Sequence, residues 1–127
     1  MPQSQTPANV ATLYARLGGA EALRAILDDI VDAHLDNHLI HTRFEPFDRQ
    51  SLKDGAFQFF ASATGGPQNY AGRGLRGTHR GMNINEQEFV AATDDVLTVL
   101  RRHGVAEREQ QEVLAAFFAM KDEVLHL

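Results

Sequence analysis

Apolar residues recur in this chain every three or four positions, and no stretch alternates between apolar and polar residues as a half-buried strand would. Residues 20–35 show this spacing most clearly. The pattern predicts an all-α protein with four main helices and two short ones. The main helices are expected over residues 20–35, 49–63, 86–103 and 107–125, and the short ones over residues 10–17 and 38–42.

Glycine, proline and capping residues separate these helical patterns. Gly18–Gly19 and Gly104 favour helix ends, and Pro46 disfavours helical geometry at the residue before it. Residues 65–67, Gly-Gly-Pro, end the second main helix. Candidate N-caps, whose side chains can accept a backbone hydrogen bond, precede three of the expected helices. They are Asn9, Asp48 and Asn85.

Length and composition restrict the class of protein. The chain has 127 residues, which corresponds to one domain, and we expect a flexible tail over residues 1–9 and the domain over 10–127. The net charge of −5, with no basic block, argues against nucleic acid as a partner. Apolar runs are too short for a membrane span and the start lacks a signal-peptide pattern, so we expect no membrane partner and a cytoplasmic location. Without cysteine, disulfides and thiolate metal sites are excluded.

A glycine-rich stretch, Tyr70–Ile84, holds a single histidine, His79, between apolar helices. A zinc ion would need three or four ligands, and this stretch supplies one. Haem iron needs only one proximal histidine, so haem ligation is the functional interpretation. The alternative is that His79 is an ordinary surface residue, and the stretch alone does not decide between the two.

Phenylalanines on the inner faces of the predicted helices allow two interpretations as well. At helical spacing they belong to the core first, and lining of a cofactor pocket is the alternative. The expected inner faces are Leu52, Ala56, Phe59, Phe60 and Ala63, then Phe89, Ala92, Val96 and Leu100, then Val113, Leu114, Phe117, Phe118, Met120 and Val124.

Several short motifs together resemble the truncated haemoglobins of the first group. Each motif is weak alone, but they occur in the family's order and spacing over nearly the whole chain. The resemblance implies a globin-like fold, the truncated two-over-two helical sandwich. The motifs are Leu13-Tyr14-x-x-Leu17-Gly18-Gly19, Phe44, Gln58-Phe59-Phe60, Gly65-Gly66-Pro67-x-x-Tyr70-x-Gly72 and Leu75-x-x-x-His79-x-Gly81-Met82-Asn83-Ile84.

The resemblance also implies a cofactor, haem b, and a role for each matching position. His79 would be the proximal iron ligand through Nε2, and its other ring nitrogen would donate to a backbone carbonyl. Phe44 would pack on the haem face, and Phe60 matches a position that gates an apolar gas tunnel in some members. Around the proximal side and edge of the haem we expect Tyr70, Leu75, Met82 and Ile84.

The chain departs from the family on the distal side of the expected haem. Val31 stands where the family usually has tyrosine, and Leu52 and Ala56 stand at positions that are usually polar. Gly55 occupies a position where some members have a sixth iron ligand. We therefore expect a five-coordinate iron and an apolar distal pocket without a hydrogen-bond donor for O₂. The ligand-pocket residues are expected to be Ile30, Val31, Phe44, Leu52 and Ala56.

Charged residues and histidines supply further candidates. Lys53, Arg73 and Arg76 are candidates for the haem propionates, with a solvated surface position as the equal alternative. His34, His38 and His41 have helical spacing, and we expect them to be exposed rather than to form a metal site. A shift of the helix would bring His34 towards the pocket, one turn after Val31.

Three functions are consistent with the resemblance. The first is reversible binding of a diatomic gas, O₂, CO or NO, including oxygen binding and transport. The second is an enzyme with nitric oxide dioxygenase or peroxidase-like chemistry, which would need a reductase that the sequence does not identify. The third is a globin-fold sensor or interaction module with little or no haem. His79 and Phe44 argue against the third function.

Overall fold

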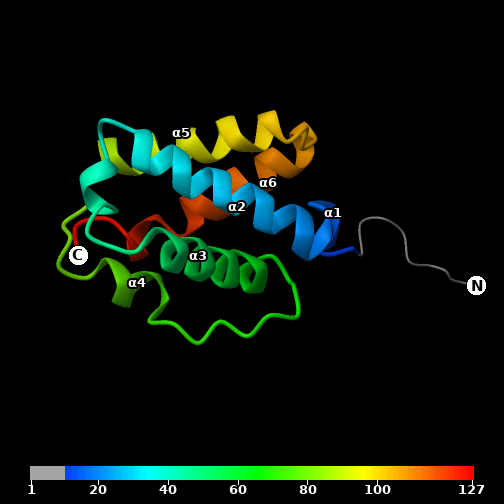
Figure 1. Cartoon of the computed structure of the whole chain (residues 1–127), viewed down its shortest axis with the longest axis horizontal. Helices are drawn as coiled ribbons and strands as arrows, with labels where there is room; N and C mark the ends of the chain where they lie inside the picture. Colours follow the sequence, from blue (N-terminus) through cyan, green and yellow to red (C-terminus); the bar gives the residue numbers. More distant parts are fainter. Residues whose placement is uncertain (1–10) are drawn as a thin grey trace, which may run out of the picture.

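The computed structural model describes residues 11–127, which form an all-α fold (Figure 1). The predicted fold class is confirmed. The helices are α1 (Leu13–Arg16), α2 (Gly19–Asp36), α3 (Arg49–Ala63), α4 (Gly74–His79), α5 (Glu86–Arg102) and α6 (Glu107–Ala119), with 3₁₀ helices η2 (His41–Arg43) and η3 (Lys121–Glu123).

The long helices form two packed pairs, α2 with α3 and α5 with α6. Helix α2 packs against both α3 and α5, and α5 packs against α6, as Figure 1 shows with α5 on one side of α2 and α3 on the other. Short α1 contacts α2 and α6, where Arg16 donates to Glu109 at 2.8 Å and to Glu112 at 2.9 Å. The two-over-two arrangement is therefore confirmed.

Several helix boundaries differ from the prediction, and the short helix expected over residues 38–42 is the 3₁₀ helix η2, His41–Arg43. Helix α1 begins at Leu13, because the Thr12 side chain accepts the Ala15 amide at 3.1 Å and caps it. The expected start at residue 10 is therefore wrong. The expected cap, Asn9, and the expected tail over residues 1–9 lie outside the described residues.

At the other end, α6 stops at Ala119, before the predicted limit at residue 125. The chain continues through η3, and its last residues pair with the segment that follows α4. There the His126 amide donates to the Ile84 carbonyl at 2.9 Å, and the Asn83 amide donates to the Leu127 carbonyl at 3.0 Å. These backbone bonds replace those that a longer helix would make.

The buried core lies where α2 meets α3 and α5. Helix α3 contributes Phe57 and Ala61, whereas the inner face expected from sequence lies partly open to a cavity. Ala63 and Phe118 are exposed, so their assignment to inner faces is wrong. The core consists of Leu17, Leu23, Ile26, Leu27, Ile30, Phe57, Ala61, Val96, Val99, Leu100 and Val113.

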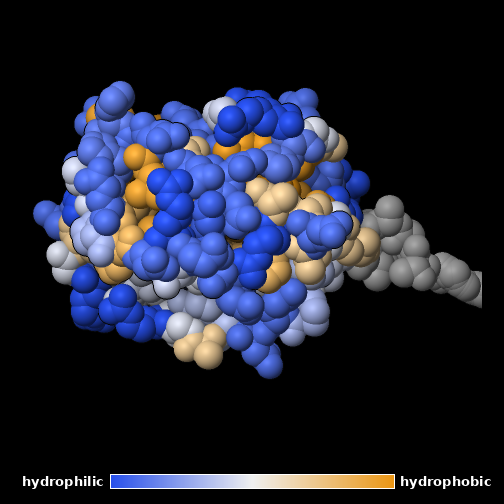
Figure 2. All heavy atoms as spheres, in the orientation of Figure 1, coloured by the Kyte–Doolittle hydropathy of each residue, from blue (hydrophilic) through white to orange (hydrophobic). Residues whose placement is uncertain are grey.

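The surface in Figure 2 is mostly hydrophilic, and hydrophobic residues form separate small patches on the face shown. The large apolar side chains that are exposed include Leu39, Phe47, Val90 and Phe118. Over residues 11–127, no helix combines the length and the apolar character that crossing a membrane requires.

We predict that Leu100→Ala lowers the free energy of unfolding by about 2–5 kcal/mol, because it leaves a cavity in a close-packed core. Leu100 is 2 % exposed, whereas Leu39 is 58 % exposed. The matched control, Leu39→Ala, should change stability by less than about 0.5 kcal/mol. Urea denaturation followed by circular dichroism measures both. Equal losses in the two variants would contradict this description of the core.

Candidate functional site

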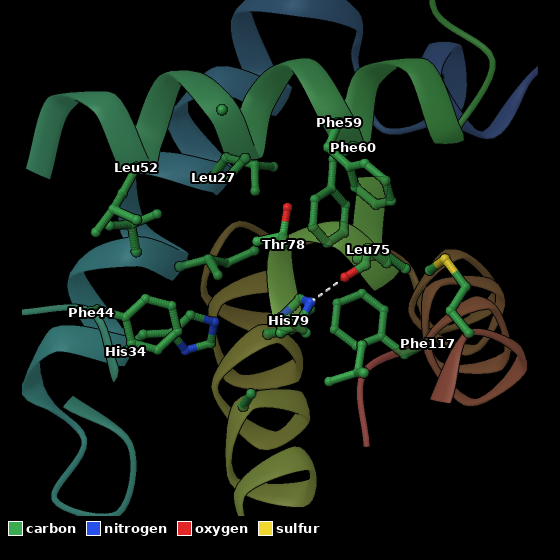
Figure 3. Close-up of a pocket in the computed structure, with 18 of the residues that line it drawn as sticks. Leu27, His34, Phe44, Leu52, Phe59, Phe60, Leu75, Thr78, His79 and Phe117 are labelled. Carbon is green, nitrogen blue, oxygen red and sulfur yellow. Dashed lines mark hydrogen bonds between the residues drawn. The ribbon is translucent and has the colours of Figure 1, made fainter. Parts of the chain in front are cut away.

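Two adjoining cavities, of about 360 and 280 Å³, lie among α2, α3, α4, α5 and the segment after α6. They share walls that include Phe44, Leu52, His79 and Phe89. Together they fall in the size range of ligand pockets in proteins, about 300–1,000 Å³. The candidate site is this pair of cavities, and Figure 3 shows the larger one.

His79 lies on the wall common to both cavities, as the last residue of α4. Its Nδ1 is 2.8 Å from the carbonyl oxygen of Leu75, one turn earlier (Figure 3). A carbonyl only accepts, so Nδ1 carries the proton and Nε2 keeps a lone pair. The hydrogen bond to a backbone carbonyl that the resemblance implied is present, and the ring can bind a metal through Nε2.

Tyr70 determines where α4 begins. Its hydroxyl accepts the Gly74 amide at 3.2 Å, and its ring meets Phe59 of α3 edge to face at 5.2 Å. Gly74 has φ +75°, a conformation that favours glycine. A Cβ at Gly72 would lie 2.2 Å from the Tyr70 hydroxyl. The glycines of this stretch therefore let Tyr70 connect α4 to α3.

The structure brings all five residues of the expected ligand pocket to the larger cavity. Phe60, Tyr70 and Leu75 line the same cavity, and Met82 and Ile84 line the smaller one. Gly55 also lines the larger cavity but offers no side chain. The five ligand-pocket residues are Ile30, Val31, Phe44, Leu52 and Ala56.

His34 also lines the larger cavity, contrary to the expectation that it is exposed. Its side chain is 12 % exposed and its ring stacks on Phe44, with 5.1 Å between ring centroids. The sequence signal was its alignment with the apolar stripe of residues 20–35. The position of this histidine on the cavity wall follows from the rotation of α2, which periodicity alone does not determine.

Other lining residues were assigned to the core or were not singled out. Phe89, Ala92 and Phe117 were expected on inner faces, and the cavities lie against these faces. Thr93 has a buried hydroxyl that donates to the Phe89 carbonyl at 2.9 Å. The other residues of the larger cavity that were not proposed for the site are Leu27, Phe59, Gly74, Thr78, Phe89, Ala92, Thr93, Val96, Phe117, Met120 and Val124.

The three expected propionate-binding residues lie in different places. Arg73 lines the smaller cavity. Lys53 and Arg76 are not among the lining residues of either cavity, and the Lys53 ammonium lies 3.1 Å from the Asp32 carboxylate on α2. Sequence reasoning did not single out Arg43, which also lines the smaller cavity.

Arg43 fixes the corner after α2 to the start of α5. Its guanidinium donates to both oxygens of Glu88, at 2.9 and 3.0 Å, and to the Met82 carbonyl at 2.7 Å. This bidentate hydrogen bond lowers the pKa of Glu88. Among residues 11–127 no group of three or more histidine, cysteine, aspartate or glutamate side chains is arranged to hold a metal ion.

Comparison with known proteins identifies relatives along the whole described chain. The family model described as "Bacterial-like globin" matches residues 12–126. Group 1 truncated haemoglobin GlbN of Mycolicibacterium paratuberculosis is 28 % identical over 117 residues, 92 % of this chain and 86 % of the relative. The protein of that name in Synechocystis is 30 % identical over 110 residues, 84 % and 89 % of the two chains.

A solved structure has a similar fold. The crystal structure of truncated haemoglobin from Tetrahymena pyriformis, in its Fe(III) form, superposes with a TM-score of 0.88 at 23 % identity. The superposition covers 92 % of this chain and 100 % of that one.

We predict that Arg43→Met destabilises the fold at neutral pH and that this loss shrinks on acidification. Arg43 lowers the folded-state pKa of Glu88 below the ordinary value of about 4.3. The stabilisation is therefore present above that value and is lost as the pH falls through the lowered pKa. Chemical denaturation from pH 7 to about pH 3 measures it.

Arg49→Met is the matched control, because Arg49 is 58 % exposed and pairs with Asp32 on the surface. It should have little effect at any pH. A pH-independent loss in Arg43→Met would show that the Glu88 carboxylate does not contribute through this pair.

Proposed function

Because the chain belongs to the bacterial-like globins, and within them to the group 1 truncated haemoglobins, we propose that it binds haem b non-covalently and holds a diatomic gas there. The proposed protein ligand to iron is Nε2 of His79. One observation carries the proposal: His79 lies between two cavities with its Nδ1 proton on the Leu75 carbonyl. The gas is O₂, CO or NO.

The residues present fit a haem. The walls of both cavities are predominantly apolar, which suits a large apolar macrocycle. Arg73 and Arg43 line the smaller cavity and place positive charge where propionates can be held. We assign the propionates first to Arg73, because Glu88 and Met82 already accept from the Arg43 guanidinium. Haem iron, when bound, supplies the bond to the gas.

His79 and its neighbours prepare the proximal side. The Leu75 carbonyl orients the imidazole and raises its basicity as a ligand. Tyr70 fixes α4 to α3, and the backbone bonds between Ile84 and His126 hold the segment after α4. These contacts lie entirely within the protein, and together they orient the imidazole ring.

The distal side is lined mainly by apolar residues. Val31, Leu52 and Ala56 carry no hydrogen-bond donor, so these residues do not stabilise a polar gas ligand. Small apolar gases can enter such a lining without displacing tightly bound water. We propose that these three residues do little to favour O₂ over other gases. The lack of a donor among them should weaken the binding of CO less, because CO is the less polar ligand.

We predict about one haem b per chain, without the attachment through cysteine that a c-type haem has, because the chain contains no cysteine. His79→Gly should lose the haem, because it removes the proposed iron ligand. The pyridine haemochrome assay and the Soret band measure loading, and added imidazole should restore part of the Soret band in His79→Gly. The control is His41→Gly, at a histidine outside the lining of both cavities. Full, imidazole-independent loading of His79→Gly would contradict the assignment.

We predict that Val31→Tyr slows O₂ release by roughly ten- to a hundredfold, the effect of one good hydrogen bond. CO release should change less. Stopped-flow displacement of O₂ by CO measures the rate. Ala56→Gln is made in parallel, because tyrosine brings extra bulk that can strain the cavity. Unchanged O₂ release in both variants would contradict the placement of Val31 and Ala56 beside the gas.

A further inference from the structure

His34 is the polar side chain that α2 contributes to the wall of the larger cavity, whereas the other α2 residues there, Leu27, Ile30 and Val31, are apolar. It belongs to α2, lines the cavity and is 12 % exposed. Figure 3 shows its ring beside that of Phe44, and the two rings are stacked with an interplanar angle of 20°. Stacking restricts the ring to one plane, so its nitrogens have defined directions.

Asp95 of α5 fixes which nitrogen of His34 carries a proton. Its Oδ2 lies 2.9 Å from His34 Nδ1. Asn37 donates from Nδ2 to Oδ1 and Oδ2 of the same carboxylate, at 3.1 and 3.0 Å. A carboxylate that already accepts from Asn37 is held as an acceptor, so Nδ1 of His34 is the donor. Within residues 11–127, Nε2 of His34 makes no hydrogen bond.

We propose that His34, positioned by Asp95, is the residue that donates a hydrogen bond to the gas ligand, through Nε2 of its protonated ring. The inference rests on the proposed function. With the Nδ1 proton committed to Asp95, Nε2 carries a proton only in the imidazolium form. The Asp95 carboxylate offsets that positive charge. O₂ draws negative charge when bound and CO draws less, so the donor favours O₂.

The proposal makes O₂ retention dependent on pH. Protonated His34 donates, and neutral His34 presents a lone pair that repels the negative end of the ligand. The other titratable residues around the larger cavity are Tyr70 and His79. The side chains that face this cavity from the neighbouring elements are otherwise uncharged: Phe44 at the corner, Leu52 and Ala56 on α3, Thr78 on α4, and Ala92 and Thr93 on α5.

The chain contains a matched control pair elsewhere. His103, at the end of α5, places Nε2 2.7 Å from Asp29 of α2. This pair has the same chemistry but lines neither cavity. A general effect of histidine–carboxylate pairs on stability would therefore appear in both pairs, whereas an effect on the gas ligand should appear only at His34.

The test measures O₂ release by stopped-flow displacement with CO across roughly pH 5 to 8, the range in which histidine titrates. In the unmodified chain, O₂ release should be roughly ten- to a hundredfold slower at the acidic end of this range, the effect of one charge-assisted hydrogen bond.

Two substitutions at His34 test whether this residue is the donor. His34→Phe keeps the stacking on Phe44 and the bulk of the ring, and should release O₂ fast at every pH. His34→Gln, a neutral donor, should slow release without pH dependence.

Two spectroscopic readouts separate this role from a structural one. In the CO form, the C–O stretching band should shift with pH in the unmodified chain and stay constant in His34→Phe. In the protein without haem, long-range ¹⁵N–¹H spectra should show the His34 proton on Nδ1 at alkaline pH, and Asp95→Asn should weaken that preference. A proton on Nε2 at alkaline pH in the unmodified chain would overturn the proposal.

Equal and pH-independent rates of O₂ release from the unmodified chain and from His34→Phe would also overturn the proposal. So would fast O₂ release at every pH from His103→Phe. A normal Soret band in the CO forms of these variants would show that haem and gas binding remain intact. In that case the role of His34 fails while the proposed function stands. Failure of the unmodified chain to bind haem would contradict the proposed function itself.

Discussion

The hydrogen bond from Nδ1 of His79 to the Leu75 carbonyl, 2.8 Å long, is the interaction on which the site depends. It fixes the tautomer and the direction of the only histidine on α4. It requires a helical turn from Leu75 to His79 in the correct place, which Tyr70 provides through its contacts with Gly74 and Phe59. The glycine-rich stretch thus contains a short helix whose position comes from tertiary contacts.

The walls around this histidine explain why α3 has two apolar faces. Phe57 and Ala61 bury against the core, while Leu52, Ala56 and Phe60 line the cavity. A helix that serves only the core needs one apolar stripe. The second stripe packs only in part against the protein, where Phe60 meets Phe117 of α6 with 5.5 Å between ring centroids, and the rest of it faces the cavity. An apolar helix face that is open to a cavity suggests a binding site for an apolar ligand. Membership of the globin family supports the proposal that this ligand is haem.

Helical periodicity predicted the fold class and most helix limits, and the family resemblance predicted which residues meet at the cavity. Periodicity could not give the rotation of α2, which places His34 beside Phe44, because the apolar stripe allows several rotations. The Arg43–Glu88 pair joins residues far apart in sequence, and α6 ends where its last residues pair with Ile84 instead. Local sequence preferences predict neither contact, since both arise from tertiary packing.

Resonance Raman spectroscopy of the ferrous, ligand-free protein tests the central claim most directly, because it detects the iron–histidine stretching vibration of a five-coordinate haem. We expect this band in the unmodified chain and its absence in His79→Gly. With imidazole added to that variant, the band should return at a shifted frequency, because free imidazole lacks the fixed hydrogen bond to Leu75. A six-coordinate low-spin spectrum, or an unchanged band in His79→Gly, would contradict the claim that His79 alone holds the iron.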